Sequence, residues 1–367
     1  MAYSINMRES NRITCLRAIC VVLVIFLHQY AGDLEGNTFV ASGSIPSNEV
    51  LQSMQYIISR IITFSAVPLF FMLSSVLLYA KEFTWKSNMK KKLKSLVLPY
   101  ILWITLYIIV YFLGQTLPMT SGFFANAGRK VSDMTIMDYI GAYTGIGGHG
   151  LFVNAMWFLR DLVILNLIAP LIKKLIDKFP LICLVLIAVL WNMGTIPEVM
   201  ILNKQSVVFF ALGYYIVKYG MRMKKLDKLS LPGAIFIYIV TVAIEFYFHI
   251  LGSSLRVAAH SFTAIVGIIL LVKLTGLLIK NDTSPVPSLL KTIAEYSFFV
   301  YASHDLIQTM MKKVTAKLLV QTDPIQMVEY FLMPIFVCCI CIGAGMLLKI
   351  IIPPLYSILT GARKQRT

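Results

Sequence analysis

Long apolar blocks alternate with short polar connections along almost the whole chain. Examples are residues 13–31, 96–113, 231–250 and 330–352. Each block is about 20 residues long, which is the length that a helix needs to cross a hydrocarbon core of about 30 Å. The core segments of a soluble protein would be shorter, so the pattern predicts an all-α integral membrane protein.

The blocks predict about ten transmembrane helices in one membrane domain that covers residues 1–367. The fifth and sixth blocks are short, and no internal repeat is visible. Residues 115–152 form a long connection that is rich in Gly and Ser and has no apolar run of spanning length. The predicted spans are 13–32, 55–80, 96–114, 153–173, 180–196, 205–220, 231–250, 257–279, 292–311 and 327–352.

The composition agrees with this pattern and indicates which partners to expect. Of the residues, 58% are hydrophobic and only 14% are charged, whereas soluble proteins carry roughly 25% charged residues. The net charge of +16 comes from Lys and Arg in the short connections. Because no soluble basic domain exists, we expect a lipid bilayer as partner and no nucleic acid.

The basic residues also predict the orientation. Cytoplasmic connections carry an excess of Lys and Arg, and a cytoplasmic N-terminus would place most of the basic residues inside. Both termini are therefore expected in the cytoplasm. The inside segments are then residues 8–17, 81–94, 173–178, 218–228, 273–291 and 349–366.

The six cysteines all lie in apolar segments, and none has metal-ligand spacing with a histidine. We therefore expect neither a disulfide framework nor a metal site. A cleavable signal peptide is not predicted either, because the first apolar block is long, contains Arg17 and His28, and is followed by no small-residue cleavage pattern.

Arg17 and His28 are the clearest polar pair at membrane depth. In a continuous helix their spacing gives a rotation about 20° from whole turns, so both side chains would share one face, about 16 Å apart along the axis. Arginine binds phosphate through a two-pronged contact, and histidine takes a proton from a hydroxyl near neutral pH. The pair therefore suits a long anionic donor that enters from the cytoplasm. The alternative is an interfacial anchor at Arg17 and a hydrogen-bonded core histidine at His28.

Other polar residues are expected in the outer half of the membrane. His304 lies in the ninth predicted span at a depth similar to that of His28, and Tyr301 precedes it by about one turn. On its own, His304 is better explained as a hydrogen-bonded core group than as a catalyst. Trp157 fits an interfacial aromatic belt.

Adjacent residues on a helix point about 100° apart, so Arg160 and Asp161 require separate partners. Arg60 is a further buried cation, and Glu245 is one candidate partner for it.

A basic cluster of Lys90, Lys91, Lys92 and Lys94 precedes the third span. Topology and contact with anionic lipid explain it. Docking of a phosphorylated donor is the alternative.

These residues resemble the signature of the membrane-bound acyltransferase family 3. Arg17 and His28, separated by ten residues, resemble its first-span motif. The segments 59–61 with 67–74, 157–159 and 301–304 resemble three further elements in the family's order. Two positions depart from the family pattern. Ser75 stands where the family often has Gly, and Lys91 and Lys94 stand where it often has an Arg pair; lysine lacks the guanidinium fork.

The resemblance implies an O-acyltransferase of the bacterial cytoplasmic membrane. It would move an acyl group, most often acetyl, from cytoplasmic acyl-CoA to a hydroxyl of an envelope glycan or lipid-linked glycan at the outer face. Acyl-CoA would be a substrate, and no permanently bound cofactor is expected. Expected roles are catalysis for His28 and Arg17, donor binding for Lys91 and Lys94, and acceptor binding or support for Arg60, Trp157, Arg160, Tyr301 and His304.

Three functions remain open at this stage. The leading one is the acyltransferase, with His28 as general base or as transient acyl carrier. A transporter of an anionic or glycan substrate would also use buried Arg and His residues, although such proteins often contain internal repeats. A non-catalytic partner of a glycan assembly complex is the third.

Overall fold

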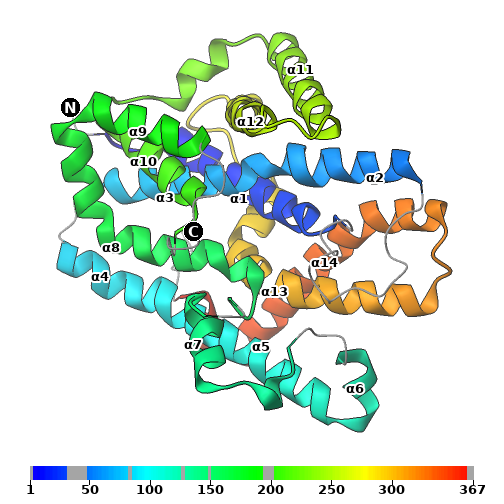
Figure 1. The fold of residues 1–367 in the computed structure, drawn as a ribbon. Coiled ribbons are helices and arrows are strands. Elements are labelled where there is room, and N and C mark those ends of the chain that lie inside the picture. The colour runs from blue at the N-terminus through cyan, green and yellow to red at the C-terminus, as the bar shows by residue number, and fades with distance from the viewer. Residues whose placement is uncertain are drawn as a thin grey trace. The chain divides into compact units, whose positions relative to one another are not determined.

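Helices make up the regular structure of this protein. The computed structural model describes residues 3–30, 48–81, 85–124, 129–147, 150–192 and 202–361, and no strand occurs within those ranges (Figure 1). The predicted all-α fold class is therefore confirmed. This outcome follows from the bilayer itself, where a helix satisfies all of its backbone hydrogen bonds internally.

Seven helical segments within the described ranges are long and apolar enough to cross a membrane, which makes this a multi-pass membrane protein. Two other predicted spans, the fifth and sixth, are the helices α9 (Pro180–Asn192) and α10 (Lys204–Lys218), which have only 13 and 15 residues. The ninth is α13 (Ser288–Leu318), which is long but carries more polar residues. The count of ten spans thus stays a prediction, as does the cytoplasmic side of the termini. The seven segments are Met7–Leu27, Glu49–Tyr79, Ser87–Thr116, Asn154–Lys178, Leu231–Ile250, Arg256–Leu278 and Asp323–Ile351.

The chain divides into two compact units, each of which is built from three stretches of sequence. Unit 1 comprises Met1–Val24, Arg60–Lys90 and Asp161–Ser297. Unit 2 comprises Ile25–Ser59, Lys91–Arg160 and Phe298–Thr367. Because one boundary falls inside α1 (Met7–Leu27), the first predicted span contributes to both units.

In unit 1, α3 (Ala66–Tyr79) and α10 approach each other closely at a pair of small residues. A Cβ added to Gly213 would lie 2.5 Å from the Cβ of Ser75 and 2.6 Å from the carbonyl oxygen of Met72. Small residues let helix backbones come together in membranes. Ser75 stands where the resembled family often has Gly. The two helices can still approach closely here, because Gly213 on the opposite helix α10 has no side chain. Unit 1 also contains η3 (Thr63–Ser65), α8 (Trp157–Lys178) from Asp161 onward, and η7 (Met223–Lys228).

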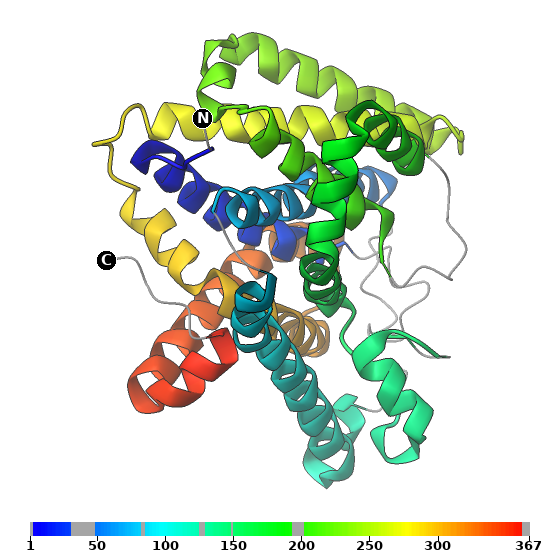
Figure 2. The ribbon, with the colours of Figure 1, turned by 90° about the vertical axis from the view of Figure 1, so that its left-hand side faces the viewer.

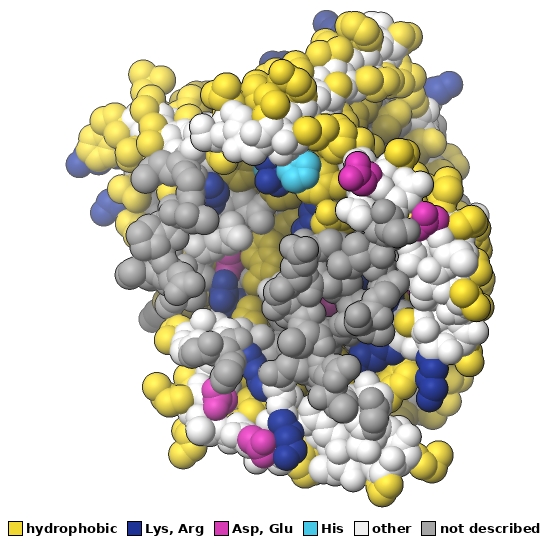
Figure 3. All heavy atoms as spheres, turned by 45° about the vertical axis from the view of Figure 1, so that its right-hand side comes forward, with side chains coloured by type: hydrophobic (Ala, Val, Ile, Leu, Met, Phe, Trp, Pro, Cys, Tyr) yellow, Lys and Arg dark blue, Asp and Glu magenta, His cyan; other side chains and the backbone are white. Residues whose placement is uncertain are grey.

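The helices α11 (Leu231–Ile250) and α12 (Arg256–Leu278) of unit 1 lie side by side in both ribbon views (Figures 1 and 2). Ser230 begins α11 by accepting a hydrogen bond from the Gly233 amide, and Pro232 stands in its first turn. Large apolar side chains such as Phe236 and Phe262 are exposed on the pair, and hydrophobic side chains cover this region at the top of Figure 3. An apolar exterior of this kind matches lipid as the surroundings.

Unit 2 contains α5 (Leu98–Thr116), the larger part of α13, and α14 (Asp323–Ile351). The Trp103 ring of α5 lies 5.3 Å from the Phe299 ring of α13, and its Nε1 donates to the Leu359 carbonyl at 3.0 Å. These contacts join α13 and the C-terminal helix to α5. Unit 2 also contains α2 (Glu49–Tyr56), η2 (Ile57–Ile62) up to Ser59, the end of α4 (Trp85–Lys92), η4 (Leu93–Val97), η6 (Asn154–Met156) and α15 (Pro353–Thr360).

The long connection 115–152 has local helices in its described part. These are α6 (Pro118–Phe124), η5 (Val131–Asp133) and α7 (Ile136–Thr144). Thr135 and Asp138 form a reciprocal capping box at the start of α7, and Gly145 ends it with φ +77°. None of the three has spanning length, as the sequence predicts.

Candidate functional site

His28 lies in the turn directly after the first helix. The prediction of one span over 13–32 is wrong at its end, because α1 stops at Leu27 and the Gln29 amide bonds the Phe26 carbonyl at 3.0 Å in a tighter turn. Residues 31 and 32 lie outside the described ranges. The helix-face geometry expected for Arg17 and His28 therefore does not apply to His28, whose orientation is set by the turn.

Side chains of unit 2 hold the backbone at this helix end. The last carbonyls of a helix have no partner within it. Gln308 Nε2 donates to the Ile25 carbonyl at 3.2 Å, and Ser59 Oγ donates to the Phe26 carbonyl at 2.6 Å. Lys312 Nζ donates to the His28 carbonyl itself at 2.8 Å. Three separate side chains thus bind the main chain at His28 and in the residues just before it.

His28 and His304 lie next to each other in unit 2. Their ring centroids are 5.2 Å apart and the ring planes are inclined by 54°. His28 is half-buried, whereas His304 is fully buried at 0% exposure. The two candidate histidines, 276 residues apart in sequence, form one cluster in which one imidazole is accessible and the other is enclosed.

The hydrogen bonds of His304 define its tautomer. Its Nδ1 is 2.7 Å from the Tyr301 carbonyl oxygen, which only accepts, so Nδ1 carries a proton. In the neutral imidazole Nε2 then carries a lone pair. Nε2 is buried and has no hydrogen-bond partner within the described part of the chain. The Nδ1 side of His304 is therefore that of a hydrogen-bonded core group, as one sequence hypothesis has it. Its Nε2 is a hydrogen-bond acceptor that no described residue uses.

Tyr107 bonds the backbone of the helix that carries His304. Its Oη accepts from the Leu306 amide and donates to the Ala302 carbonyl, both at 3.1 Å. An undisturbed α-helix pairs these two groups directly. The Tyr107 hydroxyl therefore contacts both backbone groups of the turn that carries His304, and it ties α5 to α13.

Tyr301 connects the histidine cluster to the start of α8. Its hydroxyl donates to the Ala155 carbonyl at 2.7 Å, and its ring lies 5.5 Å from the Phe158 ring in an edge-on arrangement. Trp157 begins α8 between these two contacts. The elements 157–159 and 301–304, distant in sequence, therefore meet in unit 2.

Arg160 and Asp161 have separate partners, as predicted. Arg160 Nη1 contacts the Thr144 carbonyl at 3.4 Å, at the end of α7 in unit 2. Asp161 is fully buried and accepts from the Asn203 amide at 2.9 Å in unit 1. Arg160 thus faces the long connection 115–152.

Arg17 belongs to unit 1 and contacts the first part of α13. Its Nη2 donates to the Ala294 carbonyl at 3.1 Å and to Ser297 Oγ at 2.9 Å. No described residue bonds its Nε or Nη1. The guanidinium is thus held by one nitrogen, and its remaining donors are available for a further partner.

Glu245 pairs with a histidine to which the sequence assigned no role. Its Oε1 is 2.5 Å from His260 Nδ1, and the Phe64 ring lies 3.9 Å from the His260 ring. This pair joins α11 to α12. Arg60 lies in the π-helical η2, and the suggested pairing of Arg60 with Glu245 is replaced by the contact with His260.

The candidate donor lysines, Lys91 and Lys94, are exposed side chains. Lys91 lies near the end of α4, and Lys94 lies in the π-helical η4. Their exposure is compatible with docking an anion and equally with contact to lipid headgroups, so their role stays a prediction.

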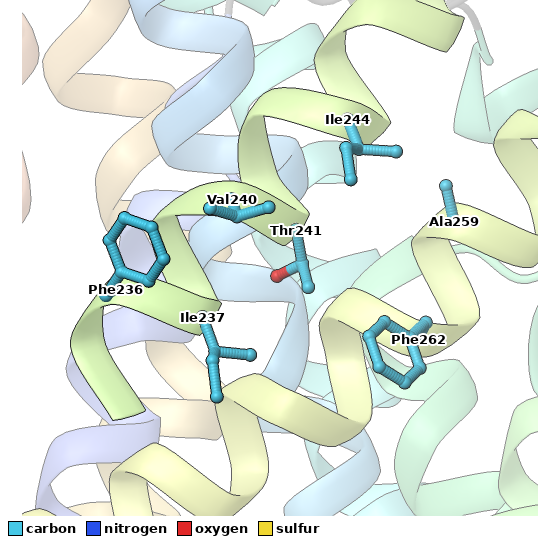
Figure 4. A pocket seen from close by; sticks show the side chains of 7 residues that line it. All are labelled: Phe236, Ile237, Val240, Thr241, Ile244, Ala259 and Phe262. Carbon is cyan, nitrogen blue, oxygen red and sulfur yellow. The ribbon is translucent and has the colours of Figure 1, made fainter. Parts of the chain in front are cut away.

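A groove of about 210 Å³ on unit 1 lies apart from this chemistry. Side chains from α11 and α12 line it, among them Phe236, Ile244 and Phe262, and Thr241 is its only polar lining residue (Figure 4). None of its described lining residues is titratable, so we do not assign the groove to catalysis.

Sequence reasoning missed Gln29, Gln308 and Lys312. Gln308 Nε2 donates to Gln29 Oε1 at 2.6 Å, and both glutamines are buried. A signal for two of them exists in the sequence, because His304, Gln308 and Lys312 follow each other at intervals of four and so follow one face of a helix.

Residues 10–349 match the family model described as an acyltransferase domain, family 3. The chain is also similar to the succinoglycan biosynthesis protein ExoH of Rhizobium meliloti (strain 1021), with 22% identity over 304 residues that cover 81% of this chain and 79% of that protein. No solved structure gives a significant match. The matched family region contains every candidate residue described above.

Proposed function

The chain belongs to acyltransferase family 3, and from this premise we propose that it is a membrane O-acyltransferase that modifies an envelope glycan. The acyl group, acetyl in the simplest case, would come from cytoplasmic acyl-CoA, and the acceptor hydroxyl would be presented at the outer face of the cell membrane. The similar protein ExoH is a succinoglycan biosynthesis protein, which supports a polysaccharide acceptor here.

The observation that carries the proposal is the pair of adjacent imidazoles, His28 and His304. An acyl transfer to a hydroxyl needs a base within reach of the hydroxyl proton. His28 is half-buried and held through its backbone by Lys312, so its imidazole is positioned without being enclosed. It is the better candidate for the group that meets both substrates.

The reaction follows from these roles. The acceptor oxygen attacks the carbonyl carbon of the thioester while His28 takes the hydroxyl proton. The carbon–sulfur bond breaks, coenzyme A leaves as the thiolate, and the thiolate recovers the proton from His28. The products are an acyl ester and the free thiol. Arg17 would bind the phosphates of the donor through the donors that α13 leaves available.

The test is acyl transfer from labelled acetyl-CoA, and from longer acyl-CoA in parallel, in membranes that contain the host's own envelope glycans. We expect label in glycan with the wild type and a loss of at least about 100-fold with His28→Ala, the range that a general base contributes. His249→Ala is the matched control, because His249 is a half-buried histidine of unit 1. It should transfer like the wild type.

Full transfer by inserted His28→Ala protein would refute the role of His28. No transfer by any variant with any donor, despite normal insertion, would instead favour the transporter alternative.

A further inference from the structure

Two buried hydrogen-bond acceptors on α13 have no donor among the residues that the structure describes. They are Nε2 of His304 and Oε1 of Gln308, which belong to residues that are 0% and 2% exposed. They stand four residues apart, so they lie on the same side of the helix about 6 Å apart along its axis. A buried polar atom without a partner costs free energy, and two of them side by side call for a common explanation.

The identity of both acceptor atoms is determined by their neighbours. The Ile25 carbonyl only accepts, so the atom of Gln308 that meets it is the amide nitrogen, and Oε1 must be the atom that remains. The Tyr301 carbonyl assigns the proton of His304 to Nδ1 in the same way. Neither assignment depends on a choice between equivalent orientations.

We propose that His304 and Gln308 form a binding site for two hydroxyl groups of a polyhydroxylated ligand, one hydroxyl donating to Nε2 of His304 and another to Oε1 of Gln308. This deepens the proposed function and rests on it, since the ligand would be the glycan acceptor. The neighbouring His28, 5.2 Å from His304 between ring centroids, would then face a sugar ring that is held at two points.

Other ligand classes fit these groups less well. An apolar ligand would leave both acceptors unpaired, and a site built to bind hydroxyls rejects such a ligand strongly. A cationic ligand would meet the ammonium group of Lys312, which is bonded to the His28 carbonyl one turn beyond Gln308, and like charges brought together are unfavourable. Neutral hydroxyl donors satisfy both atoms without this repulsion.

The site also explains why Gln308 is an amide. Its nitrogen caps α1 at Ile25 and bonds Gln29, while its oxygen points to the ligand. One side chain therefore links the backbone position of the His28 turn to recognition of the acceptor. Glutamate would lose the donor, and leucine would lose both functions.

The proposal can be tested by binding alone, without an acyl donor. The protein is labelled with ¹⁵N-histidine and placed in lipid nanodiscs; the chain has only five histidines, so His304→Phe identifies the His304 signals. The probe is octyl β-D-glucopyranoside, which offers several hydroxyls, and 1-octanol with one hydroxyl is its matched control. We expect the glucoside to move the Nε2 resonance of His304 from the value of an unbonded nitrogen to that of a hydrogen-bonded one.

Affinity is measured for the wild type and two variants. Gln308→Leu should weaken glucoside binding about tenfold, the effect of one hydrogen bond, and should leave octanol binding unchanged. Gln205→Leu, which alters a glutamine of unit 1 that also has an unpartnered oxygen, should bind the glucoside like the wild type.

The proposal is overturned if the Nε2 resonance of His304 already has the value of a hydrogen-bonded nitrogen without the probe, or if the glucoside does not move it. This outcome is decisive even if a variant fails to fold, because the measurement uses the wild type. Glucoside binding without any acyl transfer would refute the proposed enzyme function and leave the hydroxyl site standing. Acyl transfer with an unmoved His304 signal would refute the site alone.

Discussion

At the scale of single residues, the structure positions the candidate base through its main chain. The carbonyl of His28 is bonded by Lys312, and the carbonyls of Ile25 and Phe26 are bonded by Gln308 and Ser59. The imidazole itself stays half-buried. A base that must meet two substrates benefits from this division, because the backbone is ordered before binding and the ring is not enclosed.

Arg17 gives a prediction at this scale. Arg17→Lys keeps the positive charge but loses the planar fork that binds phosphate at two points. We expect the KM for acyl-CoA to rise about tenfold, with a smaller change in kcat, and Arg17→Ala to raise it further. Steady-state kinetics with membranes of each variant measure this. The control is Arg222→Lys, an arginine of the same unit that pairs with Glu9. An unchanged KM in both Arg17 variants would contradict the donor role.

At the scale of elements, α13 presents its chemistry as a stripe. Tyr301, His304, Gln308 and Lys312 recur at intervals of three or four residues, so they follow one side of the helix. The stripe, together with charged residues such as Glu295 and Asp305, lowers the mean apolarity of α13, which is not among the seven apolar spans of the described chain. A helix that is not among those apolar spans thus carries most of the candidate site.

The contact between α3 and α10 yields a prediction for stability. Gly213→Ala places a methyl group 2.5 Å from the Ser75 Cβ, and overpacking of this kind costs about 1–3 kcal/mol. We expect a lower midpoint of thermal unfolding in detergent for Gly213→Ala, and partial recovery in the double variant with Ser75→Gly, which removes the opposing Cβ. Independent effects of the two substitutions would show that the residues do not couple across this contact.

At the scale of the whole molecule, charge and apolarity predict how the chain is inserted. Most of the 33 basic residues lie in the segments assigned to the cytoplasm, and the exposed apolar side chains of α11 and α12 suit lipid. An acyl donor on one side and an acceptor on the other would require a chain of this kind, which spans the membrane several times.

The orientation is tested with reporters at the two ends. We expect the end after Thr367 to be cytoplasmic. A fluorescent protein fused there should therefore fluoresce, whereas alkaline phosphatase fused there should be inactive, because it does not become active in the cytoplasm. The same pair fused before Met1 should give the same result, since the basic segments place both ends inside. Active phosphatase at either end would contradict an even number of spans or the predicted orientation.

The sequence by itself determined the class of this protein and most of its candidate chemistry. Apolar blocks of spanning length require helices because a bilayer offers no partner for the backbone, and Arg17, His28, Tyr301 and His304 are recognisable by type and order. Helix ends were predicted less well. His28 was placed inside a helix that stops at Leu27, because the side chains that cap this end come from residues 59, 308 and 312.

Only the tertiary structure decided which polar groups meet and which of their atoms remain open. Glu245 was paired with His260 by the packing of α11 on α12, and Gln308 was joined to Ile25 across 283 positions of sequence. Nε2 of His304 is an acceptor without a donor among the described residues, because the Tyr301 carbonyl assigns the proton to Nδ1. Helical period and hydropathy are properties of neighbouring residues, whereas these contacts depend on distances between segments far apart in the chain. The physical reason is that burial removes water as the alternative partner, so the fold alone determines which polar atoms are satisfied.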